Sequence, residues 1–112
     1  MRSLASCDAL GAGVRMLVAM ERFDLRIPGC GSLKEKRHVV KTLTNQIRST
    51  FNVSVAEVDH HNLWQRTAIA VAAVSAEQYH VRKVMHEVEK FVDRWAEVET
   101  IDVELTLHYP ED

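Results

Sequence analysis

A chain of 112 residues with 46% hydrophobic and 27% charged residues is large enough to form one globular domain around one hydrophobic core. Its formal net charge of -2 argues against a strongly cationic protein that coats nucleic acid, although local basic patches are compatible with that total. Its two cysteines, Cys7 and Cys30, are too few for a disulfide framework and form no C-x-x-C pair. We therefore expect reduced thiols, no zinc or redox centre and no cofactor.

The first 15 residues show neither helical nor strand periodicity, and Asp8 interrupts their weakly apolar stretch. We interpret residues 1–15 as a disordered leader or the product of an upstream start codon, residues 16–109 as one domain and residues 110–112 as a tail. The sequence contains no secretory signal and no apolar run that could span a bilayer, which predicts a cytoplasmic protein without membrane association.

The first half of the domain predicts a strand, a helix and a second strand. Apolar residues of one parity from Leu17 to Ile27 indicate the first strand, which Pro28 and Gly29 end. Ser32 followed by Glu35 is a capping-box pattern. The apolar stripe of the helix that follows is Leu33, Val40, Leu43, Ile47 and Phe51. Asn52 ends this helix, and the valine-rich residues 53–59 form the second strand.

The second half predicts a strand, a helix and a final strand. Residues 67–74 form the third strand of a long hairpin, and Ser75 with Gln78 suggests another capping box. The next helix has the apolar face Val81, Val84, Met85, Val88, Phe91, Val92 and Trp95. Residues 101–109 alternate between apolar and polar as a half-buried strand does. The order β-α-β-β-α-β predicts an α+β, ferredoxin-like sandwich, with two helices on one face of a four-stranded antiparallel sheet.

The sheet face opposite the helices is predicted to be partly apolar. The residues concerned are Val18, Met20, Ala68, Ala70, Ala72 and Val74. Such patches usually mark interfaces, so we expect a homodimer through this face, and the alternative is that residues 1–15 fold over it. The face has no aromatic residue on these strands, which argues against an RNA-recognition-motif domain.

The first helix is basic, with Lys34, Lys36, Arg37, Lys41 and Arg48 against one acid, Glu35. Its start at Gly31 and Ser32 could bind an anion such as an RNA phosphate, assisted by Lys34 and Arg37. In the alternative interpretation, Ser32 and Glu35 already occupy the free amides and the lysines form a solvated face. The loop lacks the G-x-x-x-x-G-K-[ST] spacing of a P-loop, so ATP and GTP are not predicted.

The hairpin loop contains Asp59, His60, His61, Trp64 and Arg66. Adjacent histidines in an extended chain point to opposite sides, so we predict no metal site there. In the alternative, Asp59 and Asn62 hydrogen-bond their own backbone. Trp64 beside Arg66 suits an interface anchor or a base-stacking platform, unless the indole folds back onto the core. We find no nucleophile or carboxylate pair arranged for catalysis.

A set of linked motifs resembles the YlxP family of small bacterial proteins. The motifs are Ile-Pro-Gly at 27–29, Ser-Leu-Lys-Glu-Lys-Arg at 32–37, Val-Val-Lys at 39–41, residues 51–60 and Leu-Trp-Gln-Arg at 63–66. The resemblance covers Met16 to about Leu107 and leaves residues 1–15 without a counterpart. It implies a ferredoxin-like domain of unknown function. Genes of the family often neighbour those for translation initiation factor two and ribosome-binding factor A, which implies a role around translation or ribosome maturation.

Together these features predict a non-enzymatic accessory factor that binds RNA or a ribosomal subunit. The residues expected at that surface are Lys34, Arg37, Lys41, His60, Trp64, Gln65 and Arg66. A protein-interaction module using the apolar sheet face and the Trp64 loop is the first alternative. A metal-dependent hydrolase built on Asp59, His60 and His61 is the second.

Overall fold

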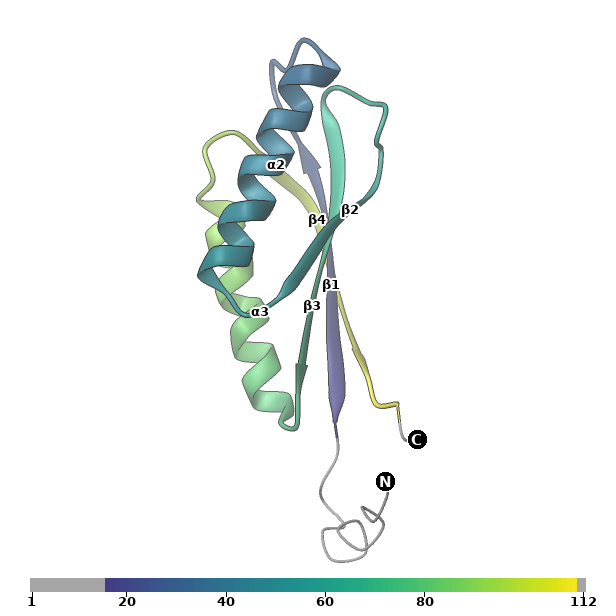
Figure 1. Cartoon of the computed structure of the whole chain (residues 1–112), viewed down its shortest axis with the longest axis vertical. Helices are drawn as coiled ribbons and strands as arrows, with labels where there is room; N and C mark the ends of the chain where they lie inside the picture. The colour runs from purple at the N-terminus through teal and green to yellow at the C-terminus, as the bar shows by residue number, and fades with distance from the viewer. Residues whose placement is uncertain (1–15, 111–112) are drawn as a thin grey trace, which may run out of the picture.

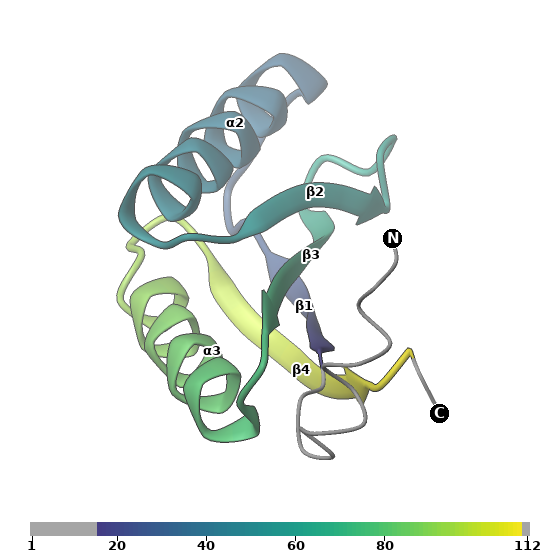
Figure 2. The same ribbon diagram turned by 60° about the horizontal axis from the view of Figure 1, so that its bottom comes forward.

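The strands and helices follow the predicted order in the computed structural model, which describes residues 16–110. The elements are β1 (Leu17–Arg26), α2 (Leu33–Thr50), β2 (Ser54–Asp59), β3 (Arg66–Ser75), α3 (Gln78–Asp93) and β4 (Glu99–His108). All strand pairs are antiparallel, and the sheet order is β2-β3-β1-β4. Both helices cover the same face of the sheet, which confirms the ferredoxin-like prediction (Figures 1 and 2). The predicted leader and the last two residues lie outside the described range.

Helix α2 begins as its sequence predicts. The Ser32 Oγ atom accepts a hydrogen bond from the Glu35 N–H at 3.1 Å, and Glu35 Oε1 accepts one from the Gly31 N–H at 2.8 Å. Two amides that would otherwise be unpaired are therefore bonded within the cap. Gly29, just before the cap, has a φ of 74°, which is why a glycine suits this turn.

Helix α3 begins differently, and the capping box predicted for Ser75 and Gln78 is wrong. Strand β3 continues to Ser75, whose Oγ accepts a hydrogen bond from the Glu77 N–H at 3.0 Å. Glu77 is the N-cap and makes no side-chain cap bond, and Gln78 is already the first helical residue. The Gln78 Nε2 atom donates instead to the Tyr109 hydroxyl at 2.8 Å. Ser75 therefore shapes the turn, because the strand is longer than predicted.

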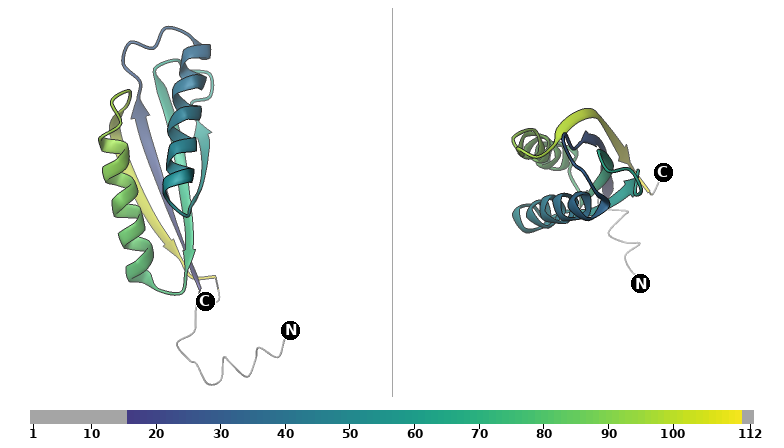
Figure 3. Two further views of the ribbon diagram at one scale, coloured as in Figure 1. Left: turned by 60° about the vertical axis from the view of Figure 1, so that its left-hand side comes forward. Right: turned by 90° about the horizontal axis from the view of Figure 1, so that it is seen from above.

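The core lies between the helices and the inward residues of the sheet. On β1 the buried residues Leu17, Ala19, Phe23 and Leu25 have the predicted parity, and Leu43 and Ile47 of α2 and Val88 of α3 pack with them. The right-hand view of Figure 3 shows the two helices side by side on the inner face. The apolar core was thus predicted by periodicity, and on β1 it has one exception.

The exception is Glu21, which shares the inward parity of β1 and is only 1% exposed. Its carboxyl group meets the side chain of Glu89 of α3, with which the protonated form of Glu21 shares a hydrogen bond. Burial raises the pKa of Glu21 to about 9, and the Glu89 carboxylate contributes to the shift. Glu21 is therefore a neutral acid in the folded protein at neutral pH.

Glu21 makes stability depend on pH in a defined direction. Between the ordinary pKa of 4.5 and about 9, the folded protein binds a proton that the unfolded chain releases. Stability should therefore fall as pH rises through this window, by up to roughly 1.4 kcal/mol per pH unit. Glu21→Gln should flatten this slope and raise the free energy of unfolding at pH ~8 by on the order of 2 kcal/mol. Urea unfolding at several pH values measures both, and equal slopes in the two proteins would contradict the assignment.

Candidate functional site

The open face of the sheet, which the helices leave uncovered, is divided into two halves. Near the start of β1 it is apolar, with Met20 44% and Val74 68% exposed. The register places Met20 beside Ala72 and Val18 beside Val74, as the predicted patch requires. Ala68 was predicted in this patch but is fully buried between its pairing partners Asp24 and Asp59. The exposed apolar area is therefore smaller than predicted and ends before the charged half begins.

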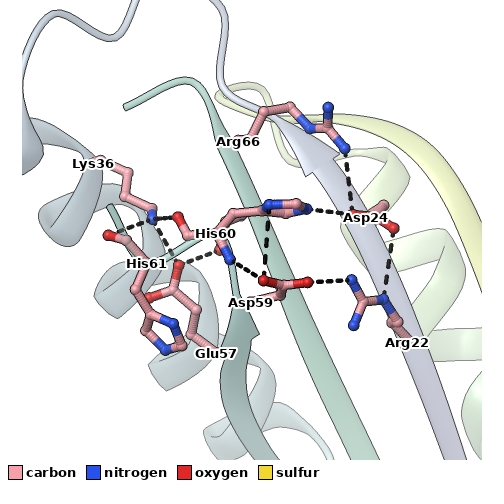
Figure 4. Close-up of polar contacts among 9 residues, drawn as sticks. Arg22, Asp24, Lys36, Glu57, Asp59, His60, His61 and Arg66 are labelled. Carbon is pink, nitrogen blue, oxygen red and sulfur yellow. Dashed lines mark hydrogen bonds and ion pairs between the residues drawn. The ribbon is translucent and has the colours of Figure 1, made fainter. Parts of the chain in front are cut away.

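The charged half is organised around Asp24, a residue that the sequence analysis did not select (Figure 4). Its carboxylate oxygens lie 3.6 Å from Arg22 Nε, 3.4 Å from His60 Nε2 and 3.5 Å from Arg66 Nη2. Asp24 also stands opposite Asp102 of β4 in the strand register. Like charges opposite each other destabilise a sheet, and the surrounding cations offset that repulsion.

Asp59 connects this cluster to the hairpin loop. It accepts hydrogen bonds from the His60 N–H at 2.7 Å and from Arg22 Nη2 at 3.2 Å. These bonds lower the pKa of Asp59 and raise that of Arg22. His60 follows with a φ of 61°, the only positive φ among the non-glycine residues described. The backbone therefore turns sharply at His60, and the predicted bond of Asp59 to its own backbone is present.

Below the loop lies Lys36, a helix residue that is 0% exposed. Its ammonium donates to the His60 carbonyl at 2.6 Å and the His61 carbonyl at 3.2 Å, and it pairs with Glu57 at 2.8 Å (Figure 4). Burial alone would raise the pKa of Glu57, but the bonds from Lys36 and Thr67 lower it. The contribution of this pair to stability is therefore present above the ordinary pKa of 4.5, and it is lost as pH falls through the lowered value.

The contacts of Lys36 with His60, His61 and Glu57, called the Lys36 clamp, join the first turns of α2 to the hairpin loop. Figure 1 shows the start of α2 and this loop at the same end of the molecule. Lys34, Arg37 and Lys41 are exposed on α2, as predicted. Two other basic residues of α2 are not part of a free basic surface. Lys36 is buried, and Arg48 donates to the Val55 carbonyl at 3.0 Å and to Asn45 at 2.8 Å. The free basic surface of α2 therefore consists of three of the five basic residues counted in its sequence.

The far side of the loop presents large apolar side chains to solvent. Trp64 is 51% and Leu63 49% exposed, so the indole does not fold back onto the core. A shallow surface cavity of about 400 Å³, widely open to solvent, lies here and is lined by Asn62, Leu63, Trp64, Gln65 and Arg66. Gln65 has a structural role in this conformation, because its Nε2 donates to the Cys30 carbonyl at 3.2 Å and its own carbonyl accepts from the Ile27 N–H at 2.9 Å.

The two histidines of the loop diverge, although the chain is not extended here as the prediction assumed, because the backbone turns at His60. Figure 4 shows the His60 ring directed to Asp24 and the His61 ring on the other side, near Glu57. Within residues 16–110 no group of three or more His, Cys, Asp or Glu side chains is placed to hold a metal ion. At the start of α2, the Gly31 amide is bonded to Glu35, which favours the alternative we set against an anion site at Gly31 and Ser32.

Three residues that organise the site were not singled out by the sequence analysis: Arg22, Asp24 and Glu57. A fourth, Lys36, was counted with the exposed basic residues. The sequence does contain a pattern that indicates the pairing of Lys36 with Glu57. Lys36 lies four and seven residues before Val40 and Leu43 on the apolar stripe of α2, and Glu57 has the inward parity of Val55. Opposite charges on two buried stripes indicate a buried ion pair, although they do not reveal which carbonyls it holds.

Replacing Lys36 by methionine should test the clamp. The change leaves the half-buried Glu57 without its cation and removes the donor to two loop carbonyls, so the free energy of unfolding should fall by about 2–3 kcal/mol. Lys34→Met on the exposed side of α2 is the matched control and should change it by less than about 0.5 kcal/mol. Urea unfolding measures both variants. Equal stability of the two variants would show that the buried ammonium does not hold the loop.

Residues 18–105 match the family described as "Protein of unknown function (DUF503)". "Uncharacterized protein YlxP" of Bacillus subtilis (strain 168) is 41% identical over 69 residues, which are 62% of this chain and 75% of that protein. No helix within residues 16–110 is long and apolar enough to cross a membrane.

Two solved structures were similar to this chain to different degrees. The de novo designed protein Foldit4 has a TM-score of 0.50 and 11% identity, with 82% of this chain and 94% of that one covered. The putative antibiotic biosynthesis monooxygenase from Bacillus cereus has a TM-score of 0.39 and 15% identity, with 85% and 92% covered. At these identities such likenesses concern the fold alone. The family match spans most of the domain and agrees with the YlxP resemblance of its motifs, so the chain belongs to the DUF503 family of proteins of unknown function.

Proposed function

We propose that this protein binds RNA as a ribosome-associated accessory factor. The proposed RNA surface consists of Lys34, Arg37 and Lys41 of α2 together with His60, Trp64 and Arg66 of the hairpin. The observation that carries the proposal is the half-exposed indole of Trp64 on a loop that Lys36 fastens to the basic helix. A stacking group and a row of cations are thereby held at one end of one rigid domain.

The basic residues of this surface share one side of α2. Arg37 and Lys41 are four residues apart, and Lys34 is three before Arg37, so the three side chains follow one stripe. Arg48, seven residues after Lys41, lies on the same stripe and contacts the Val55 carbonyl of β2. At Arg48 the stripe meets the edge strand β2, whereas at its other end Lys34 lines a hollow with His38, Ala96 and Glu97. Such a row suits the phosphates of a nucleic-acid backbone, which supply most of the sequence-independent affinity.

The loop supplies the second part of the surface. An indole left half in water is unfavourable unless it meets a partner, and base stacking on an aromatic ring is tolerant of sequence. Arg66 lies beside it with one guanidinium nitrogen 3.5 Å from Asp24. This ion pair fixes the direction of the guanidinium and leaves it partly exposed for a phosphate.

Substitutions in the two parts of the surface should weaken RNA binding in different ways. Replacing Lys34 and Arg37 with alanine should weaken binding to ribosomal RNA and reduce the salt slope by roughly 0.7 per lost contact to a single strand. Trp64→Ala should cost about 1–3 kcal/mol and leave the slope nearly unchanged. Replacing the exposed Arg82 and Lys83 of α3 is the matched control and should have little effect. Filter binding across a salt series measures these changes, and no binding of the wild-type protein at low salt would exclude the proposal.

A second candidate function uses the apolar half of the open face, and we propose that its partner is a second copy of this chain. On this half β1 carries Val18 and Met20, and β3 carries Val74 beside Val18 and the smaller Ala72 beside Met20. A two-fold axis along these strands would place Met20 of one copy over Ala72 of the other, which is the self-complementarity that an isologous interface requires. Sheets packed face to face in this way lie about 10 Å apart.

Substitution of Met20 should test this interface. Light scattering should give twice the chain mass of 12.8 kDa for the wild-type protein and a single chain mass for Met20→Glu, because the change buries an unpaired carboxylate in each copy. Ile101→Glu is the control, since Ile101 is exposed to a similar extent but belongs to the end of β4 that pairs near Arg26. A wild-type protein that stays monomeric at all concentrations would exclude the dimer.

A further inference from the structure

We propose that the cavity beside the hairpin loop holds one unpaired nucleobase, with Trp64 as its stacking platform and Asn62 as the residue that reads its edge. This proposal rests on the proposed RNA binding and adds a specificity to it. The cavity is the 400 Å³ space lined by residues 62–66. Its walls combine exposed apolar side chains with a few polar groups, which suits a ligand with flat apolar faces and a polar rim.

The polar side chains of this cavity differ in whether their hydrogen-bonding groups already have partners within the protein. The Gln65 carboxamide donates to the Cys30 carbonyl, and the Arg66 guanidinium pairs with Asp24. The carboxamide of Asn62 has no hydrogen-bond partner within the described part of the chain. The expectation from sequence that Asn62 bonds its own backbone is therefore not met. Asn62, an exposed residue of the cavity lining, therefore has a donor and an acceptor that no described residue occupies.

A carboxamide has a geometry that favours one base. Its donor and acceptor match the N6 amino group and the N7 atom of adenine, so asparagine forms a two-bond pair with that base. In an unpaired nucleotide this edge is open, whereas in an RNA duplex it lies in a narrow groove that side chains cannot read. The indole beside it covers one face of the base and Leu63 adds apolar wall. The arrangement therefore favours an unpaired adenine over a pyrimidine.

The loop is held in place on both sides of Asn62, so the cavity exists before a ligand arrives. On one side Lys36 bonds the carbonyls of His60 and His61, and the His60 carbonyl also accepts from the Leu63 N–H at 3.1 Å. On the other side the Ile27 N–H bonds the Gln65 carbonyl. A segment with fixed ends loses less conformational entropy on binding than a free loop does.

The experiment measures binding of short oligoadenylate, oligouridylate and oligocytidylate by quenching of tryptophan emission. The protein has two tryptophans, so a Trp95→Phe background leaves Trp64 as the reporter. Oligoadenylate should bind roughly tenfold more tightly than the pyrimidine oligomers and quench Trp64. Asn62→Ala should remove most of this preference while quenching and the salt dependence of binding stay unchanged. Asn52→Ala, an exposed asparagine outside the loop, is the matched control and should keep the preference.

The outcomes separate this inference from the proposed function on which it rests. If all three oligomers bind equally and quench Trp64, RNA binding stands and the adenine site is excluded. If Asn62→Ala keeps the preference of the wild-type protein, the reading role of Asn62 is likewise excluded. If no oligomer and no ribosomal RNA binds at low salt, both the proposed function and the adenine site fail. Loss of folding in Asn62→Ala would be visible as a change in its urea unfolding, and Asn62→Asp, which keeps the shape but removes the donor, then replaces it in the same assay.

Discussion

The ammonium of Lys36 is the interaction on which the architecture of the site depends. A lysine is expensive to bury, and this one is accommodated because Glu57 supplies the opposite charge and two consecutive carbonyls supply acceptors. Those carbonyls belong to the residues where the hairpin turns, including His60 with its positive φ. One side chain therefore compensates its own burial, fixes an unusual backbone turn and joins helix α2 to the loop that carries Trp64.

The open face of the sheet has an apolar part and a charged part that do not overlap. Arg22 marks the border, since it pairs with Asp24 and Asp59 and stands next to the apolar rows. Beyond it Arg22, Asp24, Asp59 and Arg66 are joined by ion pairs, which hold this part of the face in place. The exposed cations Lys34, Arg37 and Lys41 lie instead on the outer side of α2, and exposed large apolar side chains lie on the loop and at the start of β1.

Ionisable groups of the same fold have opposite consequences. Lys36 and Glu57 compensate each other, which favours their charged forms, whereas Glu21 is held neutral by burial and by its hydrogen bond with Glu89. The first arrangement specifies a loop conformation. Glu21 lies on the inner face of β1, opposite the open face, and is not part of the proposed surfaces.

The sequence by itself determined the order of elements, most of the core and the family, because each depends on periodicity or local motifs. Alternation on β1, the stripe of α2 and the cap at Ser32 are properties of neighbouring residues, and they persist whatever packs against them. Only the tertiary structure decided that Lys36 is buried, that Ser75 ends a strand and does not cap a helix, and that Trp64 is exposed. Each of these depends on which partner reaches the side chain across the fold: Lys36 meets carbonyls 24 and 25 residues away, and Asp24 meets Arg66 from another strand. Spacing along a chain reports the face on which a residue lies, whereas burial of a charge depends on compensating groups that long-range pairing brings to it.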